Sequence, residues 1–331
     1  SDFIYVEVEA GQGFYTWIDY NDNGIQEFDE FEIAEFQDQA NFLRVPLPNL
    51  QFIATQSAKI NQSITLNANQ WSNKTGLKKV LSHFYNQFFL SSRNELERAR
   101  NSFNLNPFNM NKDKQISVNF TIKNSLYFNR GLQNFSATYT YAKAENKQQY
   151  SIGSQDTDTN YQQIDFQHKI SKFWLIDLQG KLSENKLETE NFNNRNYEID
   201  VIAFQPKISY VLNNDNRFAA FYHMKNKENT LAEFEKLKQQ KIGVEYFYTG
   251  KSTSQFNANF TTFFNDFSGN PNSPVGYQML EGLQEGTNYT WTFLWNKKLN
   301  SFLNVNLNYK GRKSLNSKTI HTGTINLKAV F

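Results

Sequence analysis

The chain has 331 residues, a formal net charge of +2 at pH 7, no cysteine and an aromatic content of 16%. The lack of cysteine excludes thiol catalysis, disulfide frameworks and zinc–thiolate sites. The basic residues are scattered and do not form the stripe that a nucleic-acid partner requires, so no nucleic-acid partner is expected. No run approaches the roughly 20 apolar residues of a transmembrane helix. A mean hydropathy of −0.68 still permits spanning strands, because these present only alternate residues to lipid.

Two short strands are predicted at the start of the chain, over residues 3–9 and 14–20. Between them, Gly11 and Gly13 permit a tight turn, because glycine adopts backbone conformations that other residues avoid. The two strands are therefore predicted to pair as a hairpin.

Residues 19–30 read D-x-N-x-N-G-I-Q-x-x-x-E, which is the spacing of a calcium loop. Calcium prefers about six to eight oxygen ligands, and short Asp and Asn side chains supply them within a compact bend that Gly24 permits. The predicted ligands are Asp19, Asn21, Asn23, the backbone carbonyl of Ile25, and Glu30. The alternative interpretation is a solvated acidic turn without metal.

This loop resembles EF-hand-type loops and, more closely, the D-x-N-x-N-G-I-Q loops of extracellular β-sandwich repeats in bacterial surface proteins. It departs from the EF-hand because it follows a predicted strand and carries Asn21 and Asn23 where Asp is common. The resemblance implies a structural Ca²⁺ site with the weak affinity of an extracellular module, since fewer negative ligands bind calcium less tightly.

The segments that follow the loop give weaker signals. Residues 31–40 are expected to form one helical turn or an irregular connector, and residues 42–48 contain too much proline for a central strand. Residues 1–50 are therefore interpreted as a small β-hairpin and loop region, which lies against a larger unit formed by residues 51–331.

From about residue 53 onward, apolar and polar residues alternate. This period of two predicts antiparallel strands with one apolar face, most clearly over residues 116–128 and in the final hairpin of 303–309 and 325–331. Thirteen spans have fair signals. The predicted fold is an all-β antiparallel transmembrane barrel of about 14 strands, with 12 to 16 possible, because such barrels usually have even counts. The additional strand is predicted within residues 40–58, unless two of the segments are miscounted. If the true number of strands is odd, the alternative is a wall completed by sequence upstream of Ser1 or by a partner.

The connections between these strands fall into two classes. The short ones lie near residues 71–76, 129–132, 171–173, 213–217, 249–254 and 297–301. The longer, polar ones lie near residues 92–114, 144–160, 183–198, 225–240, 267–286 and 311–319. Alternation of short and long connections is typical of barrels with short periplasmic turns and longer extracellular loops. The direction of the first clear strand then predicts that the calcium loop lies on the extracellular side, whereas an additional, proline-containing strand before it would place the loop in the periplasm.

The final strand alternates apolar and polar residues and ends on Phe331. It resembles the terminal strand of bacterial outer-membrane β-barrel proteins. The resemblance implies a location in the outer membrane of a Gram-negative bacterium, contact with membrane lipid and lipopolysaccharide, and protein partners in that membrane. The chain also resembles barrel modules with D-x-N-x-N-G-I-Q loops that accompany secretion or outer-membrane assembly machinery. A start at Ser1 without a leader suggests the C-terminal module of something larger.

The sequence contains no G-x-S-x-G, H-E-x-x-H, Walker or G-x-G-x-x-G motif. Its histidines stand far apart, and we expect His168 to be an interfacial residue and His223 to be solvated in the lumen. The protein is therefore predicted to be no enzyme but an anchor or scaffold subunit of a cell-envelope complex. The alternative is a solute pore or transporter. The apolar loop at 269–286 is expected to plug the lumen, to dock on a partner, or to pack among neighbouring loops.

Overall fold

The computed structural model describes residues 2–48, 53–98, 115–132, 134–250, 254–300, 302–315 and 317–329. The terminal Phe331, on which one resemblance was based, lies outside these ranges. Within them, no helix has the length and apolar character needed to cross a membrane.

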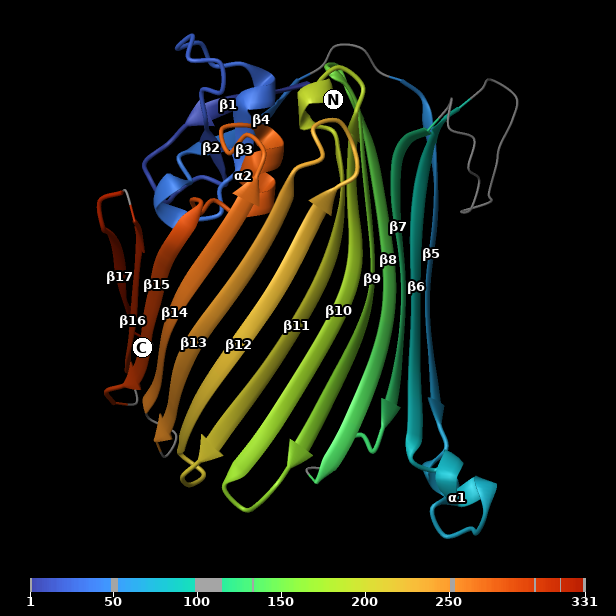
Figure 1. Cartoon of the computed structure of the whole chain (residues 1–331). Helices are drawn as coiled ribbons and strands as arrows, with labels where there is room; N and C mark the ends of the chain where they lie inside the picture. Colours follow the sequence, from blue (N-terminus) through green and yellow to red (C-terminus); the bar gives the residue numbers. More distant parts are fainter. Residues whose placement is uncertain are drawn as a thin grey trace.

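Thirteen strands form one antiparallel sheet, in which each strand pairs with its neighbours in sequence (Figure 1). The strands are β5 (Thr55–Asn67), β6 (Phe84–Glu97), β7 (Gln115–Phe128), β8 (Phe135–Tyr150), β9 (Gly153–Lys169), β10 (Trp174–Thr189), β11 (Tyr197–Val211), β12 (Asn216–Asn229), β13 (Lys236–Gly250), β14 (Ser254–Ser268), β15 (Gly286–Lys298), β16 (Leu303–Ser314) and β17 (Ile320–Ala329). The predicted all-β antiparallel architecture is confirmed.

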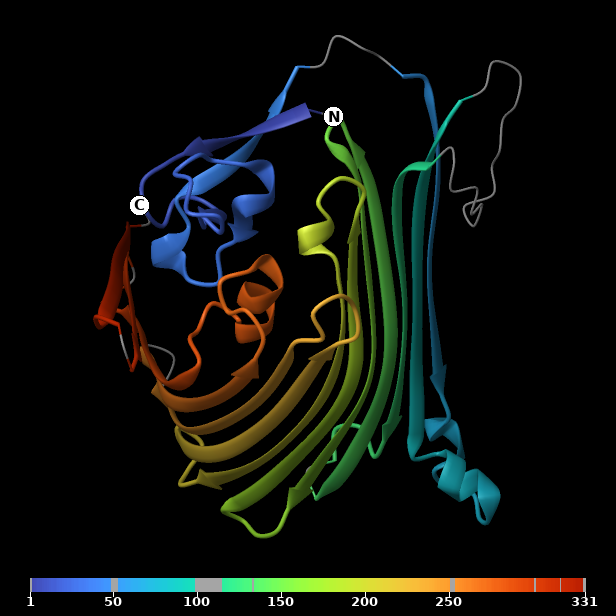
Figure 2. The same cartoon turned by 45° about the horizontal axis from the view of Figure 1, so that its top comes forward.

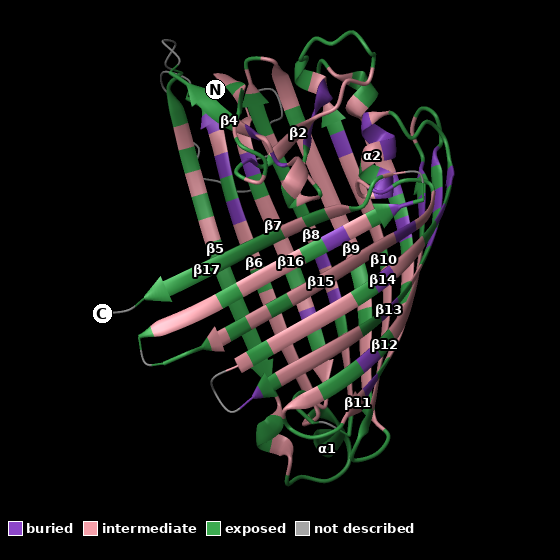
Figure 3. Cartoon of the chain, turned by 90° about the vertical axis from the view of Figure 1, so that its left-hand side faces the viewer, coloured by how far each residue is buried: buried purple, intermediate pink, exposed green. Residues whose placement is uncertain are grey.

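The alternation of residues gives this sheet two different faces. On β13, Ile242 and Val244 are each 54% exposed, whereas Leu237 and Gln239 are fully buried on the opposite face. The apolar positions form the outer face, and the polar positions face the concave side. Residues 2–48 and 274–280 lie on the concave side (Figure 2). Figure 3 shows that buried residues gather near one end of the sheet, around the short helix α2 (Pro274–Leu280).

An aromatic belt follows the outer face near one end of the strands. Phe128 contacts Phe135, which contacts Phe166 at a ring-centroid distance of 5.2 Å. Farther along the sheet, the belt continues through Phe218, Tyr246, Phe256 and Phe293. Aromatic girdles of this kind mark the interface between lipid and water. His168 lies beside Phe166 in this belt, as predicted.

Most of the strands extend beyond the thickness of a bilayer. A tilted spanning strand needs about 9–11 residues, and β9 has 17. Part of the sequence predicted as long loops is therefore strand: β8 and β9 continue to Tyr150 and Gly153, so that the connection expected at 144–160 is a tight turn. Polar residues can form hydrogen-bonded strands above the membrane just as they do within it.

We name the two ends of the sheet by their connections. The short-turn end carries residues 170–173 and 212–215, and the long-loop end carries residues 190–196 and 269–285. The connection from β5 to β6 at the short-turn end is longer than expected, because residues 68–83 contain the 3-10 turn η3 (Asn69–Trp71) and α1 (Leu77–Leu81).

A separate four-stranded sheet occupies the N-terminal part of the chain. It contains β1 (Asp2–Glu7), β2 (Tyr15–Trp17), β3 (Phe31–Ile33) and β4 (Phe42–Leu47) in the order β1-β4-β2-β3. The short 3-10 turns η1 (Phe28–Glu30) and η2 (Gln37–Gln39) connect its strands. We call residues 2–48 the N-terminal module. It lies at the long-loop end, on the concave side (Figures 1 and 2).

The structure corrects three expectations for this region. β1 does not pair with β2 as a hairpin, because β4 lies between them. β4 is therefore a central strand despite Pro46. It pairs with β2 only at Phe42, so the Pro46 end has a strand partner on one side only, which is the edge condition that proline tolerates. Finally, the fourteenth barrel strand expected within residues 40–58 is not found in the described part of that segment, since β4 belongs to the small sheet.

Leu182 and Ser183 on β10 face opposite sides of the large sheet. Leu182 is 54% exposed on the outer face, and Ser183 lines a cavity on the concave side. We predict that Leu182→Arg lowers the free energy of unfolding in lipid vesicles by about 2–4 kcal/mol, because it places a charge in hydrocarbon. The matched variant Ser183→Arg should cost far less. Urea titration followed by tryptophan fluorescence measures both, and equal losses would contradict the assignment of the outer face.

Candidate functional site: the filled mouth of the sheet

The loop between β14 and β15 contains a short helix, α2 (Pro274–Leu280). Ser273 caps its start, because its hydroxyl accepts a hydrogen bond from the Gly276 N–H at 3.0 Å. Pro274 follows at the first helical position, where its missing N–H costs nothing. Glu281 ends the helix in a left-handed conformation with φ of 56°. These local signals explain why this loop folds into a defined shape.

α2 folds inward onto the concave side of the large sheet. Met279 is 0% exposed and Leu280 is 2% exposed. The apolar cluster that buries them contains Ile199, Val201, Leu237, Phe267 and Val275, with Tyr197 packed against it. Burial of side chains of this size contributes about 1.5–3 kcal/mol each. Of the alternatives raised by the sequence for this loop, the structure therefore shows the inward fold.

An ion cluster fixes the end of α2 to the wall. The Glu281 carboxylate contacts the ammonium groups of Lys225 at 2.6 Å, Lys227 at 2.9 Å and Lys241 at 3.6 Å. Burial alone would raise the pKa of Glu281, but the three lysines together hold it well below its usual range. Lys227 also donates to the Met279 carbonyl at 2.9 Å. One buried ammonium group therefore binds both the backbone of α2 and the side chain of its C-cap residue, Glu281.

The N-terminal module docks first on the turn between β10 and β11, at η5 (Asn193–Arg195). Arg195 donates to the Phe31 carbonyl at 3.1 Å and to the Glu32 carboxylate at 2.9 Å. Asn194 donates to Asp29 at 2.7 Å. Burial raises the pKa of Glu32 to about 7 in spite of Arg195. The stabilisation that arises from this raised pKa of Glu32 is therefore fully present below about pH 4.5 and is lost as the pH rises through about 7.

A second contact joins the module to α2 and β16. The Tyr277 hydroxyl accepts from the Glu35 N–H at 3.1 Å and donates to the Ile33 carbonyl at 3.2 Å. Arg312 on β16 forms a bidentate pair with Asp38, and its guanidinium lies 4.1 Å from the centre of the Phe36 ring. Bidentate pairing and stacking both depend on the planar guanidinium group.

A third contact reaches the turn between β8 and β9. The Phe3 ring meets the Tyr150 ring edge-on at 5.2 Å, and the Arg44 guanidinium lies 5.3 Å from the centre of Tyr150. The module thus touches the large sheet at β8–β9, at β10–β11, at α2 and at β16. We call this arrangement of module and α2 across the long-loop end the filled mouth.

The predicted calcium loop lies on the exposed side of the module. The Asp19 carboxylate accepts hydrogen bonds from the N–H groups of Asn23 at 3.1 Å and Gly24 at 2.8 Å. Asn21 accepts from Asn23 at 3.0 Å, and Asn23 accepts from Ile25 at 2.6 Å. Three of the predicted side-chain ligands are thereby brought into one compact bend, and each oxygen retains a lone pair.

Glu30, the last predicted ligand, has an additional structural role that the sequence did not suggest. It is 2% exposed, and its carboxylate accepts from the Trp17 indole at 2.8 Å and from the Tyr20 N–H at 3.3 Å. No group of three or more His, Cys, Asp or Glu side chains is placed to share a metal within the residues that the structure describes. A cation in this loop would therefore depend on amide and carbonyl oxygens as well as on Asp19 and Glu30.

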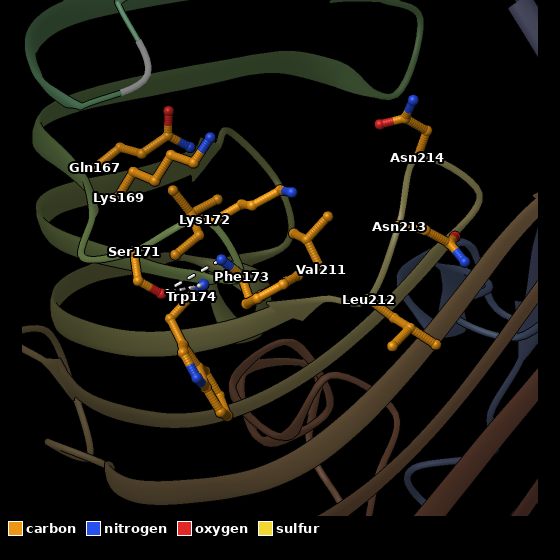
Figure 4. A pocket seen from close by; sticks show the side chains of 11 residues that line it. Gln167, Lys169, Ser171, Lys172, Phe173, Trp174, Val211, Leu212, Asn213 and Asn214 are labelled. Atoms are coloured by element: carbon orange, nitrogen blue, oxygen red, sulfur yellow. Dashed lines mark hydrogen bonds between the residues drawn. The ribbon is translucent and has the colours of Figure 1, made fainter.

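Below the filled mouth, the concave side contains a cavity of ≈ 470 Å³. Its lining includes His223, Lys181, Lys225, Lys227, Glu35 and Glu281. His223 faces the concave side, as expected, but is half-buried rather than fully solvated. A second hollow of ≈ 450 Å³ lies at the short-turn end, where the Phe173 and Trp174 N–H groups both donate to the Ser171 hydroxyl (Figure 4).

The remaining histidines do not line these cavities. His83 is hydrogen bonded to the Asn129 side chain at 2.6 Å, and His168 to the Asn134 carbonyl at 2.6 Å. His321 is hydrogen bonded to the Tyr309 hydroxyl at 2.8 Å. These contacts are of the kind that fixes turns and strand ends.

Comparison with solved structures identifies similar folds. The ferric-catecholate import receptor Fiu of E. coli, in its open form, is similar with a TM-score of 0.50 at 9% sequence identity, over 88% of this chain and 60% of the receptor chain. OmpT of Vibrio cholerae is similar with a TM-score of 0.36 at 5% identity, over 79% and 86% of the two chains. The translocator domain of the autotransporter NalP from Neisseria meningitidis gives 0.29 at 8% identity, over 85% and 89%. No family model and no curated protein matches the chain.

The likeness to the receptor concerns the fold alone, and the chain spans less than two thirds of the receptor's length. Together with the thirteen antiparallel strands, the apolar outer face and the aromatic belt, it defines the class. This is a transmembrane β-barrel protein of the outer membrane, with lipid around its outer face.

Arg312 and Arg93 provide a matched test of the docking contacts. Arg312 pairs with Asp38 in a partly buried site, whereas Arg93 pairs with Glu95 on its own strand and is 56% exposed. We predict that Arg312→Lys weakens docking of the N-terminal module by about 1–3 kcal/mol, because lysine cannot form the bidentate pair. Arg93→Lys should change stability by less than about 1 kcal/mol. The rate at which protease releases residues 2–48 reports docking, and equal rates in the two variants would disprove the prediction.

Proposed function

We propose that this protein is a non-enzymatic anchor or scaffold subunit of a cell-envelope complex, of the secretion or outer-membrane assembly type. The observation that carries the proposal is the filled mouth. The chain's own residues occupy the long-loop end, held by the Arg312–Asp38 pair, by Arg195 and by the Glu281 ion cluster. A fixed filling suits a structural subunit better than it suits a passage for solutes.

The N-terminal module also supplies a surface suited to a protein partner. Ile4 and Val6 on β1 are 40% and 38% exposed, and Val45 and Leu47 on β4 are 39% and 42% exposed. Ile4 lies directly opposite Val45 in the strand register, so these side chains share one face of the small sheet. A contiguous exposed apolar patch of this kind commonly marks a protein–protein contact.

A solute pore or transporter is the second candidate function. It is favoured by the polar concave face and by the cavity of ≈ 470 Å³ below the mouth, lined by lysine, glutamate and glutamine side chains. A passage along this face would have to bypass α2 and the module, or these elements would have to move.

Conductance in planar bilayers distinguishes the two functions. We predict that the protein purified from its own membrane gives no steady open-state current. Replacement of residues 270–284 by a short Gly/Ser linker should produce current, because it removes α2 from the mouth. A control replacement of the short turn at 213–215 should remain silent. Steady current from the unaltered protein would reject the scaffold proposal in favour of the pore.

We further propose that residues 19–30 bind Ca²⁺ as a structural ion. The donor set supports this proposal: Asp19, Asn21 and Asn23 lie in one bend with free lone pairs, and hard oxygen donors are the ligands that calcium prefers. Bound calcium would join the exposed loop to Glu30, which is anchored by Trp17 in the interior of the module.

Thermal melting with calcium and with chelator tests this site. We predict that calcium raises the melting temperature of the N-terminal module, since an ion that binds only the folded loop stabilises it. Asp19→Asn should reduce the shift. Asp22→Asn removes the same charge at a position that is not a predicted ligand, and asparagine tolerates the left-handed backbone there, where φ is 56°. An equal loss in both variants, or no shift in the parent, would refute a specific site.

A further inference from the structure

The two outermost strands of the large sheet, β5 and β17, each have one strand partner within the described residues. β5 pairs only with β6, and β17 pairs only with β16. Each of these strands therefore has a second edge whose backbone N–H and C=O groups pair with no described strand. On β5 this holds for residues 59–67. Hydrocarbon offers no water to such groups, so an open sheet edge is not sustained in a membrane.

Both edge strands lie at membrane depth. β5 has 13 residues and β17 has 10, and each is long enough to cross a bilayer. Their outer faces carry the same apolar residues as the rest of the wall: Leu66 is 63% exposed, and Ile325 and Leu327 are 67% and 68% exposed. The unpaired edges are therefore part of the spanning wall and not of its extramembrane ends.

Both edges lack two of the features with which soluble proteins protect an exposed strand, namely proline and bulges. Each edge strand carries one lysine at a concave-facing position, Lys59 on β5 and Lys328 on β17, where polar residues predominate throughout this sheet. β5 and β17 contain no proline, and their ladders to β6 and β16 run without a register shift. Regular edges of this kind are suited to pairing with a further strand.

Strand direction decides what that further strand can be. Because thirteen strands alternate in direction, β5 and β17 both run from the long-loop end to the short-turn end. Direct pairing of β5 with β17 would therefore be parallel, within one chain or between two copies that lie the same way in the membrane. Only an odd number of additional strands restores an antiparallel ladder at both edges.

We propose that a transmembrane β-segment outside residues 1–331 fills the gap between β5 and β17 with an odd number of amphipathic strands. The strands next to β5 and β17 both run from the short-turn end to the long-loop end. Each alternates apolar and polar residues, so that its apolar side chains continue the outer face of Leu66 and Ile325. This inference rests on the edges of the sheet and holds for a scaffold and for a pore alike.

Cross-linking in the native outer membrane tests the proposal. A photo-reactive phenylalanine analogue is placed at Ser63 or Thr65 on β5, or at Thr324 on β17, which all face the concave side. We expect covalent products at both edges with a segment outside residues 1–331 whose sequence alternates apolar and polar residues. When the probe moves from Ser63 to Thr65, the attachment site should move by two residues toward the N-terminus of that segment, as an antiparallel neighbour requires. The same probe at Ser183, in the middle of the sheet, should give products only within the chain.

Disulfide formation between introduced cysteines tests whether β5 and β17 pair directly instead. Because the chain has no cysteine of its own, any disulfide within it must join the introduced positions. Asn306→Cys with Asn326→Cys joins two residues that lie opposite each other on β16 and β17, and its rapid oxidation shows that the sheet is folded. Ser63→Cys with Thr324→Cys should remain reduced. A disulfide between these two positions in one chain, a cross-linked product of two copies, or no product at either edge of the folded protein would overturn the proposal.

Discussion

The need of every backbone N–H and C=O group for a partner inside the bilayer is the constraint on which this structure depends. It explains why a chain with a mean hydropathy of −0.68 can belong to a membrane. The ladders from β5 to β17 satisfy the polar backbone, and only alternate side chains need to be apolar. The same constraint gives the two edges of the sheet their importance, because they are the places in the described wall where the ladder stops.

The concave side satisfies a different requirement, which is to place polar and charged groups away from water without leaving them unpaired. Lys225, Lys227 and Lys241 share the Glu281 carboxylate, and the fully buried Asn229 amide donates to the Leu231 carbonyl and to the Glu235 carboxylate. Removing one member of such a cluster leaves another uncompensated, so the cluster resists rearrangement. α2 is in this way joined to the wall by charge as well as by the apolar contacts of Met279 and Leu280.

The N-terminal module and α2 depend on each other for their positions. The Tyr277 hydroxyl bonds to both the Ile33 carbonyl and the Glu35 N–H, so the helix that fills the mouth also holds the small sheet above it. Arg195 and Arg312 hold the same sheet from two distant parts of the wall. The module thereby links β10–β11 with β16 across the concave side, and presents its calcium-type loop and its apolar face outward.

The sequence by itself determined the strands, their two faces and the compact bend at residues 19–30, because these depend on the period of two and on short-range hydrogen bonds such as that from Gly24 to Asp19. It also indicated the apolar character of the loop that contains α2, whereas the Ser273 cap was recognised only in the structure. Only the tertiary structure decided that β4 lies between β1 and β2, that Glu30 accepts from Trp17, and that Glu281 meets three lysines from β12 and β13. Strand pairing and ion clusters bring together residues that are distant in the chain. A local sequence pattern does not determine which distant residue pairs with which strand, donor or charge. The sequence pattern contained thirteen strand signals, which is an odd number. Only the pairing of the whole sheet shows that β5 and β17 each have one strand partner among the described residues.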